Sequence, residues 1–476
     1  MNKFKNEDFD ESMKISFDYN YAMNDFLESE KAITSADIDS YSNRVREVIK
    51  DIKAERKAGK LPFMDLPYDS ENIDEVRELA GKVRYLCDDF VVLGLGGSAL
   101  GATALKQALT PPFFHIENIE ERNAPKLIVA DNIDPDWMES MLASVKRNRT
   151  IFNVISKSGS TAETMSQFLI AVKHLKEHHG AKYKDFIVAT TDIKEGTLRE
   201  MVTRDGFASL VVPEGVGGRF SVLSPVGLFP AAIIGIDIDQ LLAGARYMDK
   251  LCQEEDVRKN PAAISALIYY LYYKKGRNIS VMMPYSSALK DIADWYRQLW
   301  AESLGKKLDL DGKAVNVGQT PINALGITDQ HSQLQLYVEG PDDKIITFIK
   351  VEEFHNEMKI PKEYADLDGV GYLGGNTLNK LINSELRATE ITLMKNKRPN
   401  CTITVPKVNP FTVGQIIYML EVQTAIMGGL LNINTYDQPG VEQGKKYTYG
   451  MMGKKGFSAK NEEIENQKGK SDKYKL

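Results

Sequence analysis

The sequence has few cysteines and no long uninterrupted apolar run. Its three cysteines, Cys87, Cys252 and Cys401, lie far apart among 476 residues, which excludes a disulfide framework and a CxxC motif. We interpret them as reduced core residues of a cytoplasmic protein. The charged N-terminal stretch MNKFKNEDFDESMK lacks the apolar core of a signal peptide. The most apolar segments, 226–238 and 416–431, are interrupted by Gly, Pro or polar residues, so we expect buried elements and no membrane span.

A basic excess and a metal-binding motif are also missing. The formal net charge of −6 argues against a nucleic-acid-binding protein, because such proteins carry clustered Lys and Arg. Of the six histidines, His174, His178 and His179 share one Lys/Glu-rich stretch, which is typical of a solvated helix face. The sequence contains no P-loop, HExxH or GxSxG. We therefore expect no metal and no cofactor.

What the sequence does contain is short apolar runs that alternate with helical stretches, the pattern of an α/β protein with parallel sheets. In such sheets the ligand loops follow the carboxyl ends of the strands. We predict strands at 90–93, 126–130, 152–155, 185–189, 210–212, 279–283, 334–338, 345–349 and 402–405. We predict helices at 72–86, 260–275, 288–304, 377–395 and from 412 onward.

The stretch SKSGST, 156–161, connects one of these strands to a helix with apolar residues at Met165, Phe168, Leu169 and Val172. Hydroxyl groups, a glycine and a lysine at a helix N-terminus form a good cradle for an anion, because free backbone N–H groups and the helix dipole point at one spot. The anion that suits it is a small phosphate ester. An ordinary loop with a Ser/Thr N-cap is the alternative.

A second candidate loop is GLGGSALG, 94–101, which also follows a strand and opens a helix. Gly94, Gly96 and Ala99 fit a relaxed dinucleotide fingerprint, so a nicotinamide-dependent dehydrogenase is an alternative. The acidic residue expected about 20 residues later is not clearly present. Ser98 directly after two glycines suits a single phosphate, and two such loops on one sheet favour a shared phosphate pocket.

Four further side chains could carry chemistry. Glu302 and Gln298 lie on the flank of an apolar helical stripe, where a partly desolvated carboxylate can act as a base. His331 follows Asp329 in a polar turn, where a neutral imidazole could transfer protons with Asp329 setting its tautomer. Arg219, after two glycines, is suited to a developing oxyanion, and a structural ion pair is equally compatible. Lys445 could donate a proton or bind a sugar oxygen.

Six blocks, read together, resemble the glucose-6-phosphate isomerase family in its bacterial form, over about residues 60–450. They are GLGGSALG, SKSGSTAET, VGGRFSVLSPVG, QLWAESLGK, DQHSQLQLYVEGP and GGLLNINTYDQPGVEQGKKY. The resemblance implies two sugar-isomerase-type three-layer αβα domains at 61–245 and 246–440. The charged residues 1–60 are predicted from their own pattern to form a helical N-terminal segment. The resemblance places the catalytic lysine in a C-terminal segment, 441–476.

The resemblance also implies a role for each matching residue. Glu302 matches the base that moves a proton between C2 and C1, and Arg219 matches the residue that stabilises the enediolate. His331 and Lys445 match the pair associated with ring opening. The positions that match substrate-binding residues are Gly97, Ser98, Ser156, Lys157, Ser158, Gly159, Ser160, Thr161, Gln298 and Gln438. Ser160 replaces the usual threonine and Tyr436 a common phenylalanine, and neither change removes a functional group.

The expected reaction is therefore the reversible isomerisation of glucose 6-phosphate and fructose 6-phosphate through a cis-enediol. Family members commonly borrow the histidine from the neighbouring subunit, so the resemblance implies a homodimer with shared active sites. Two alternatives remain open: an isomerase that also accepts mannose 6-phosphate, and a non-catalytic sugar-phosphate sensor. The sensor would not need Arg219, Glu302, His331 and Lys445 together.

Overall fold

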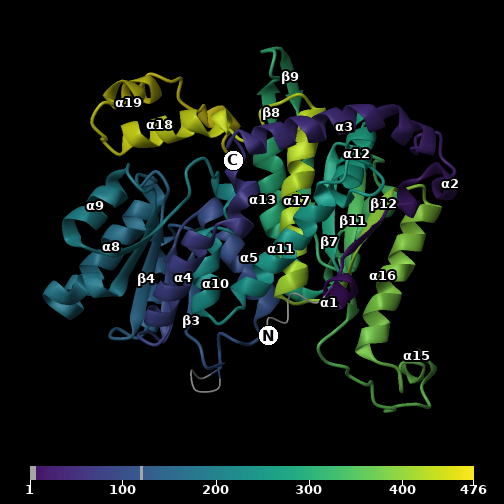
Figure 1. The fold of residues 1–476 in the computed structure, drawn as a ribbon, viewed down its shortest axis with the longest axis horizontal. Coiled ribbons are helices and arrows are strands. Elements are labelled where there is room, and N and C mark those ends of the chain that lie inside the picture. Colours follow the sequence, from purple (N-terminus) through teal and green to yellow (C-terminus); the bar gives the residue numbers. More distant parts are fainter. Residues whose placement is uncertain (1–6, 118–121) are drawn as a thin grey trace. The chain divides into compact units, whose positions relative to one another are not determined.

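Two five-stranded sheets organise most of the chain (Figure 1). The structure is a computed structural model that describes residues 7–117 and 122–476. By its internal contacts the chain divides after Thr435, and both sheets belong to the larger, first unit. The α/β class and the parallel sheets expected from the sequence are confirmed.

The first sheet is parallel throughout and has the strand order β3-β2-β4-β5-β6. Every residue of β2 and β4 is buried, as expected for a parallel sheet covered on both faces. Helices α7, α8 and α9 contribute the apolar residues that pack on one face, and α4, α5 and α10 contact strands of this sheet as well. The strands are β2 (Asp89–Leu93), β3 (Lys126–Ala130), β4 (Thr150–Ile155), β5 (Ile187–Thr191) and β6 (Ala208–Val211).

The second sheet has the order β1-β12-β11-β7-β10, in which only the edge strand β1 is antiparallel to its neighbour. Helices α14 and α16 supply apolar residues to the cluster on one face, and α12, α13 and α17 contact its strands too. The strands are β1 (Ser16–Asp18), β7 (Ile279–Pro284), β10 (Thr320–Asn323), β11 (Lys344–Glu353) and β12 (Asn400–Lys407). A separate antiparallel hairpin is formed by β8 (Lys306–Leu308) and β9 (Ala314–Val317).

Eight of the nine predicted strands are present, and the prediction of a strand at 334–338 is wrong. Residues Leu334–Glu339 form helix α14. Leu334, Tyr337 and Val338 face the apolar cluster of the second sheet, a spacing of three and four residues, whereas Leu336 is exposed. The apparent alternation of Leu334, Leu336 and Val338 was therefore part of a helical period. The edge strand β10, which pairs with β7, was not indicated by the sequence pattern.

The helices of the first unit agree with the prediction at 72–86, 260–275, 288–304, 377–395 and from 412, apart from their ends. Of the apolar residues noted in α8, Phe168 is buried and Leu169 is exposed. Within the N-terminal segment, residues 7–60 hold three α-helices, with strand β1 between the first and the second. The helices are α1 (Glu7–Ser12), α2 (Asn24–Leu27), α3 (Ser35–Lys57), α4 (Ser70–Val83), α5 (Leu100–Leu109), α7 (Pro135–Ser144), α8 (Ala162–His179), α9 (Thr197–Asp205), α10 (Pro225–Ile233), α11 (Ile238–Cys252), α12 (Pro261–Lys274), α13 (Lys290–Leu304), α14 (Leu334–Glu339), α15 (Asp368–Gly371), α16 (Leu378–Lys395) and α17 (Pro410–Leu430).

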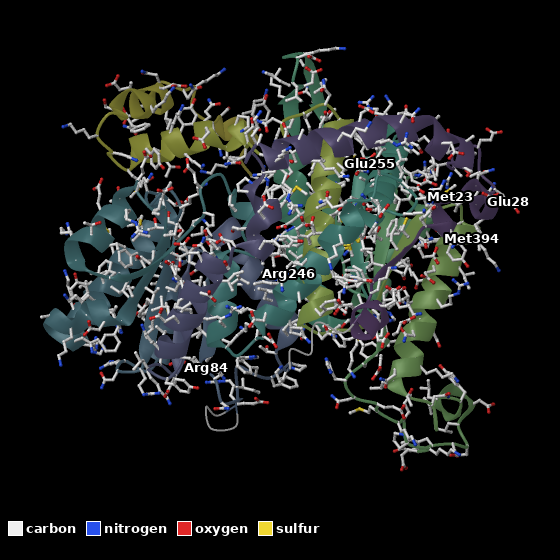
Figure 2. The ribbon with its side chains drawn as sticks, in the orientation of Figure 1. Met23, Glu28, Arg84, Arg246, Glu255 and Met394 are labelled. Carbon is white, nitrogen blue, oxygen red and sulfur yellow. The ribbon has the colours of Figure 1, made fainter. Side chains whose placement is uncertain are left out.

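Helix α17 is buried on nearly all sides, which explains its lack of a polar face. Asn409 caps its N-terminus by accepting from the Thr412 N–H. Tyr418 on α17 donates to Asp249 on α11 at 2.6 Å, and Arg56 on α3 donates to the same carboxylate at 2.8 Å. One turn earlier on α11, the guanidinium of Arg246 (Figure 2) donates to a backbone carbonyl of the segment after α3. These bonds fix α3, α11 and α17 to one another.

The second unit consists mainly of two helices, α18 (Glu442–Met451) and α19 (Ser458–Glu465). The rings of Tyr449 and Phe457 pack edge to face with centroids 5.2 Å apart, which joins α18 to the residue that precedes α19. Across 7–117 and 122–476, no helix combines the length and the apolar character needed to cross a membrane. The apolar segments 226–238 and 416–431 fall mainly in the buried helices α10 and α17.

Candidate active site

The best-defined part of the candidate site is an ion pair between Arg219 and Glu302. Arg219 lies in a short 3-10 turn, Gly218–Phe220, and is only 2% exposed. Its Nη1 is 3.3 Å from Glu302 Oε2. A buried guanidinium needs hydrogen-bond acceptors, and two others are Ser303 Oγ and the Thr435 carbonyl oxygen, each at 2.7 Å. The structure therefore brings the predicted base and the predicted oxyanion-stabilising cation into contact.

Helix α13 places Glu302 at the edge of its buried apolar stripe, as the sequence pattern predicted. Ile292, Trp295, Leu299 and Trp300 are buried, and the Glu302 side chain remains 36% exposed at the edge of this stripe. Gln298, one turn earlier, donates from Nε2 to Glu302 Oε1 at 3.2 Å. Each carboxylate oxygen of Glu302 thus has one donor, and the carboxylate is still accessible from outside.

The loop Gly94–Gly101 lies against this pair. A Cβ added at Gly97 would be 2.1 Å from the carbonyl carbon of Gly218 and 2.7 Å from the backbone nitrogen of Arg219. A Cβ added at Gly96 would be 2.9 Å from Gln298 Nε2. Only glycine permits such close approach of the two backbones. Ser98, at the end of the 3-10 turn Gly96–Ser98, is half-buried and precedes α5.

The second loop, Ser156–Thr161, follows β4, the neighbour of β2, so the two loops emerge from adjacent strands of the first sheet. Thr161 is the N-cap residue of α8, but its side chain makes no capping bond. Its hydroxyl lies 3.2 Å from Ser156 Oγ and 3.5 Å from Ser158 Oγ. The ordinary Ser/Thr cap is therefore not formed, and the cluster of hydroxyls stands at the positive end of α8, an arrangement suited to an anion.

Backbone geometry holds this second loop in place. Gly159 has φ +60°, and a Cβ there would be 2.6 Å from the backbone nitrogen of Leu198. Ser160 is half-buried, and its N–H points to Ser158 Oγ at 3.4 Å. Lys157 donates to the Val216 carbonyl at 2.9 Å, so its ammonium group binds the segment that leads to Arg219. The prediction that Lys157 binds substrate is not tested by this contact.

His331 lies on the short 3-10 turn Thr328–His331 and is exposed. Its side chain makes none of the contacts that join Arg219, Gln298 and Glu302. The Asp329 carboxylate, which we predicted to set the His331 tautomer, accepts from the Leu325 N–H at 2.7 Å and from Ser332 Oγ at 2.5 Å.

Gln438 and Lys445 belong to the second unit. Gln438 precedes the 3-10 turn Pro439–Val441, and Lys445 lies in the second turn of α18. Lys445 Nζ is 2.8 Å from Glu442 Oε1 on the same helix.

Ser303 and Thr435 contact Arg219 but were not among the residues predicted from the sequence. A signal for Ser303 was available, because it follows Leu299 by four residues and so lies on the buried stripe, where a hydroxyl needs a partner. No comparable signal exists for Thr435, whose contribution is a backbone carbonyl. The three cysteines are buried and unpaired, as predicted.

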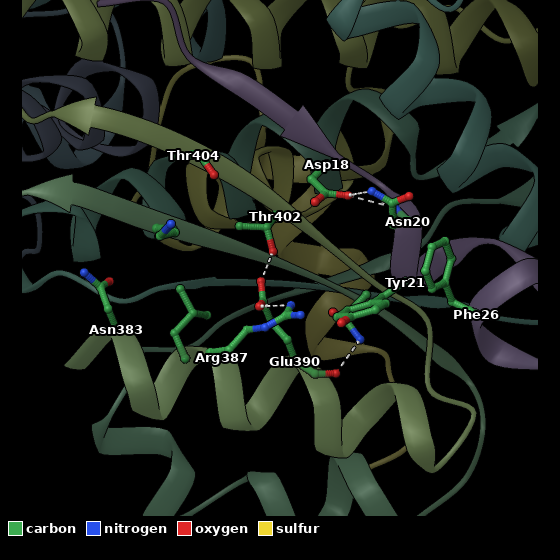
Figure 3. A pocket seen from close by; sticks show the side chains of 12 residues that line it. Asp18, Asn20, Tyr21, Phe26, Asn383, Arg387, Glu390, Thr402 and Thr404 are labelled. Atoms are coloured by element: carbon green, nitrogen blue, oxygen red, sulfur yellow. Dashed lines mark hydrogen bonds and ion pairs between the residues drawn. The ribbon is translucent and has the colours of Figure 1, made fainter. Parts of the chain in front are cut away.

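A separate cavity of about 540 Å³ lies between α16 and the edge of the second sheet (Figure 3). Glu390 at its wall accepts from Thr402 and from Arg387. Its lining includes none of the predicted site residues. The cavity is thus distinct from the loops and the ion pair described above.

Two mainly parallel sheets, adjacent loops on the first sheet that suit an anion, and an arginine–glutamate pair beside one of them fit an α/β enzyme of the isomerase class. The chain belongs to the phosphoglucose isomerase family, whose family model matches residues 71–467.

Individual relatives agree with this assignment. The chain is 46% identical to the glucose-6-phosphate isomerase of Carboxydothermus hydrogenoformans, over 95% of this chain and 97% of that protein. It is 44% identical to the enzyme of the same name from Rubrobacter xylanophilus, over 94% and 99% of the two chains. A crystal structure of a hypothetical protein from Thermus thermophilus has a TM-score of 0.80 and 35% identity, covering 92% of this chain and all of that one, 100%.

Proposed function

We propose that this chain catalyses the reversible isomerisation of glucose 6-phosphate and fructose 6-phosphate. The observation that carries the proposal is the Arg219–Glu302 contact beside the loop at Gly97, in a chain of the phosphoglucose isomerase family. An aldose–ketose isomerase needs one group that carries a proton between two adjacent carbons and one cation for the charge that develops on their oxygens. Glu302 and Arg219 supply this combination.

In the proposed reaction, the loops at Gly97–Ser98 and Ser156–Thr161 hold the sugar phosphate and so orient the distant carbons. His331 and Lys445 transfer protons at the ring oxygen and at O1, which opens the ring. Glu302 takes the proton from C2, and the enediolate forms with its charge beside Arg219. A proton passes from O2 to O1, and Glu302 returns the carbon-bound proton at C1, which leaves the ketone at C2. Gln298 steadies the Glu302 carboxylate, and Gln438 binds a sugar hydroxyl. These residues need no cofactor for the proton transfers.

The direct test is a coupled assay of fructose 6-phosphate conversion by the purified full chain, with and without a chelator. We expect turnover that the chelator does not change. Binding of the hexose phosphate without turnover would support the sugar-phosphate sensor instead. The same assay with mannose 6-phosphate defines whether the substrate range is broader.

The proposed assembly is a homodimer in which His331 serves the active site of the partner subunit. It is supported by the exposed position of His331 and by exposed apolar side chains between β11 and α16, namely Met358, Tyr364, Leu367 and Tyr372. Mixing the Glu302→Gln and His331→Ala variants tests whether each active site takes Glu302 from one subunit and His331 from the other. Random re-pairing gives heterodimers with one intact site, so activity should recover to about a quarter of the wild-type value. No recovery, with re-pairing demonstrated, would place both residues in one subunit.

Two further proposals concern organisation and location. We assign one domain to each sheet, at 61–245 and 246–440, flanked by the segments 1–60 and 441–476. A separate apolar cluster on each sheet supports this division.

We also propose a cytoplasmic location, supported by the three buried, unpaired thiols. Fractionation of the native cells with an antibody to the chain tests the location.

A further inference from the structure

The guanidinium of Arg219 is held by more than its carboxylate partner. Nε donates to Ser303 Oγ and Nη2 donates to the Thr435 carbonyl, both at 2.7 Å, whereas Nη1 is 3.3 Å from Glu302 Oε2. Ser303 is 0% exposed and Thr435 is 3% exposed. The two shorter bonds therefore go to buried neutral acceptors, where the low local dielectric strengthens them.

These two bonds set the direction in which the third nitrogen points. A guanidinium is planar and rigid, so fixing Nε and Nη2 fixes its plane and its rotation. Both acceptors are themselves held in place. Ser303 is in the last turn of α13, and Thr435 packs against α17, where a Cβ added at Gly428 would be 1.8 Å from Thr435 Oγ1.

Ser303 is also the residue that follows the proposed base. Successive residues on a helix point about 100° apart, so Glu302 lies at the flank of α13 while Ser303 points inward. The same turn of helix thus carries the carboxylate and the hydroxyl that orients the arginine facing it. Any rotation of this turn would move the Glu302 carboxylate and the Ser303 hydroxyl together, so their positions relative to each other would not change.

We propose that Ser303 is a positioning residue of the isomerase reaction, an inference that rests on the function proposed above. Its hydroxyl holds Arg219 so that Nη1 faces Glu302 and the negative charge that develops on the enediolate oxygens. The two loops bind the substrate phosphate in this proposal, and Ser303 does not contact it. The contribution of Ser303 therefore falls on the transition state and not on ground-state binding.

Steady-state kinetics of Ser303→Ala test this. We expect kcat to fall about 10- to 100-fold, as for loss of a hydrogen bond to a charged group, with KM within about twofold. Ser303→Thr, which keeps the hydroxyl, should restore most of kcat. Ser265→Ala is the matched control, because Ser265 is equally buried in a helix and bonds only to the Ala262 carbonyl; it should leave kcat unchanged.

A binding measurement separates positioning from a merely structural role. A phosphorylated five-carbon hydroxamate, which resembles the enediolate, should bind Ser303→Ala more weakly by about the factor lost in kcat, whereas inorganic phosphate should bind equally well. If Ser303→Ala does not fold, Ser303→Cys replaces it in both measurements. Unchanged kcat, or equal loss of both ligands, would overturn the proposal. An active Glu302→Gln variant would instead contradict the proposed function itself.

Discussion

Arg219 and His331 represent two differently built regions of the candidate site. Arg219 is buried, and hydrogen bonds to α13 and to the Thr435 carbonyl align it with Glu302 inside a single chain. His331 is exposed on a short turn and touches neither residue. The proposed proton-transfer pair is therefore preassembled by the fold, whereas His331, proposed for ring opening, makes no contact with that pair.

Removing the proposed base should have the largest effect. Glu302→Gln keeps the shape and the contact with Gln298 but removes the basic group, so kcat should fall by about 10³-fold or more. The midpoint of thermal unfolding should change little, because the side chain is partly exposed. Glu339→Gln, an exposed glutamate on α14, is the control. Near wild-type turnover in the coupled assay would remove Glu302 from this role.

The Arg219→Lys variant should have the second-largest effect. It keeps the positive charge but loses the planar guanidinium group with its several N–H donors. A single ammonium cannot reach Ser303, Thr435 and Glu302 in the directions that a planar guanidinium does. We expect kcat to fall about 100-fold with KM little changed, as for loss of one preorganised oxyanion contact. Arg258→Lys, at an exposed ion pair with Asp39, should be without effect. Equal activity of both variants would mean that charge alone suffices.

His331→Ala should affect one step only. Ring opening should slow, so turnover of the cyclic substrate should fall about 100-fold. Exchange of the C2 proton into deuterated solvent should persist for the open-chain form, because the Arg219–Glu302 pair is intact. Proton NMR of fructose 6-phosphate and glucose 6-phosphate in D2O follows both processes. Loss of exchange in proportion to turnover would show that the two regions do not act separately.

Gly97→Ala tests the packing behind the preassembled region. The new methyl group would meet the backbone of Gly218 and Arg219, which cannot rotate away, so the free energy of unfolding should fall by about 1–3 kcal/mol. Gly81→Ala is the matched control on α4. Nothing lies within 4 Å of its added Cβ, and it should stabilise by about 0.5–1 kcal/mol. Urea unfolding of both variants gives the comparison, and a stable Gly97→Ala would refute the close approach.

The smallest effect concerns the turn that carries His331. Burial alone would raise the pKa of Asp329, but hydrogen bonds from Ser332 and the Leu325 N–H outweigh it and lower that pKa. A depressed carboxyl pKa contributes stability above the ordinary value of 3.8 and loses it as the pH falls through the lowered value. Asp329→Asn should therefore be slightly less stable than wild type at pH 7, and the difference in urea unfolding should vanish in acid. A constant difference would exclude this linkage.

Local sequence patterns predicted the elements that carry the site. The continuous apolar runs at 90–93 and 152–155 form β2 and β4, because a strand buried on both faces has little room for polar side chains. The buried stripe of α13 and the flank position of Glu302 follow from the helical period. The prediction of a strand at 334–338 is wrong because the few apolar residues there fit both the two-residue period of a strand and the period of a helix. Only packing against the second sheet selected the helix.

The α/β class and the two loops could be predicted from the sequence alone, since local periodicity and motif spacing carry that information. Which groups meet depends on the folded chain: Ser303 with Arg219, the Thr435 carbonyl with the same guanidinium, and Lys157 with the Val216 carbonyl. Such contacts join residues that are distant in the chain. Their geometry depends on how whole helices and loops pack, which no local pattern specifies.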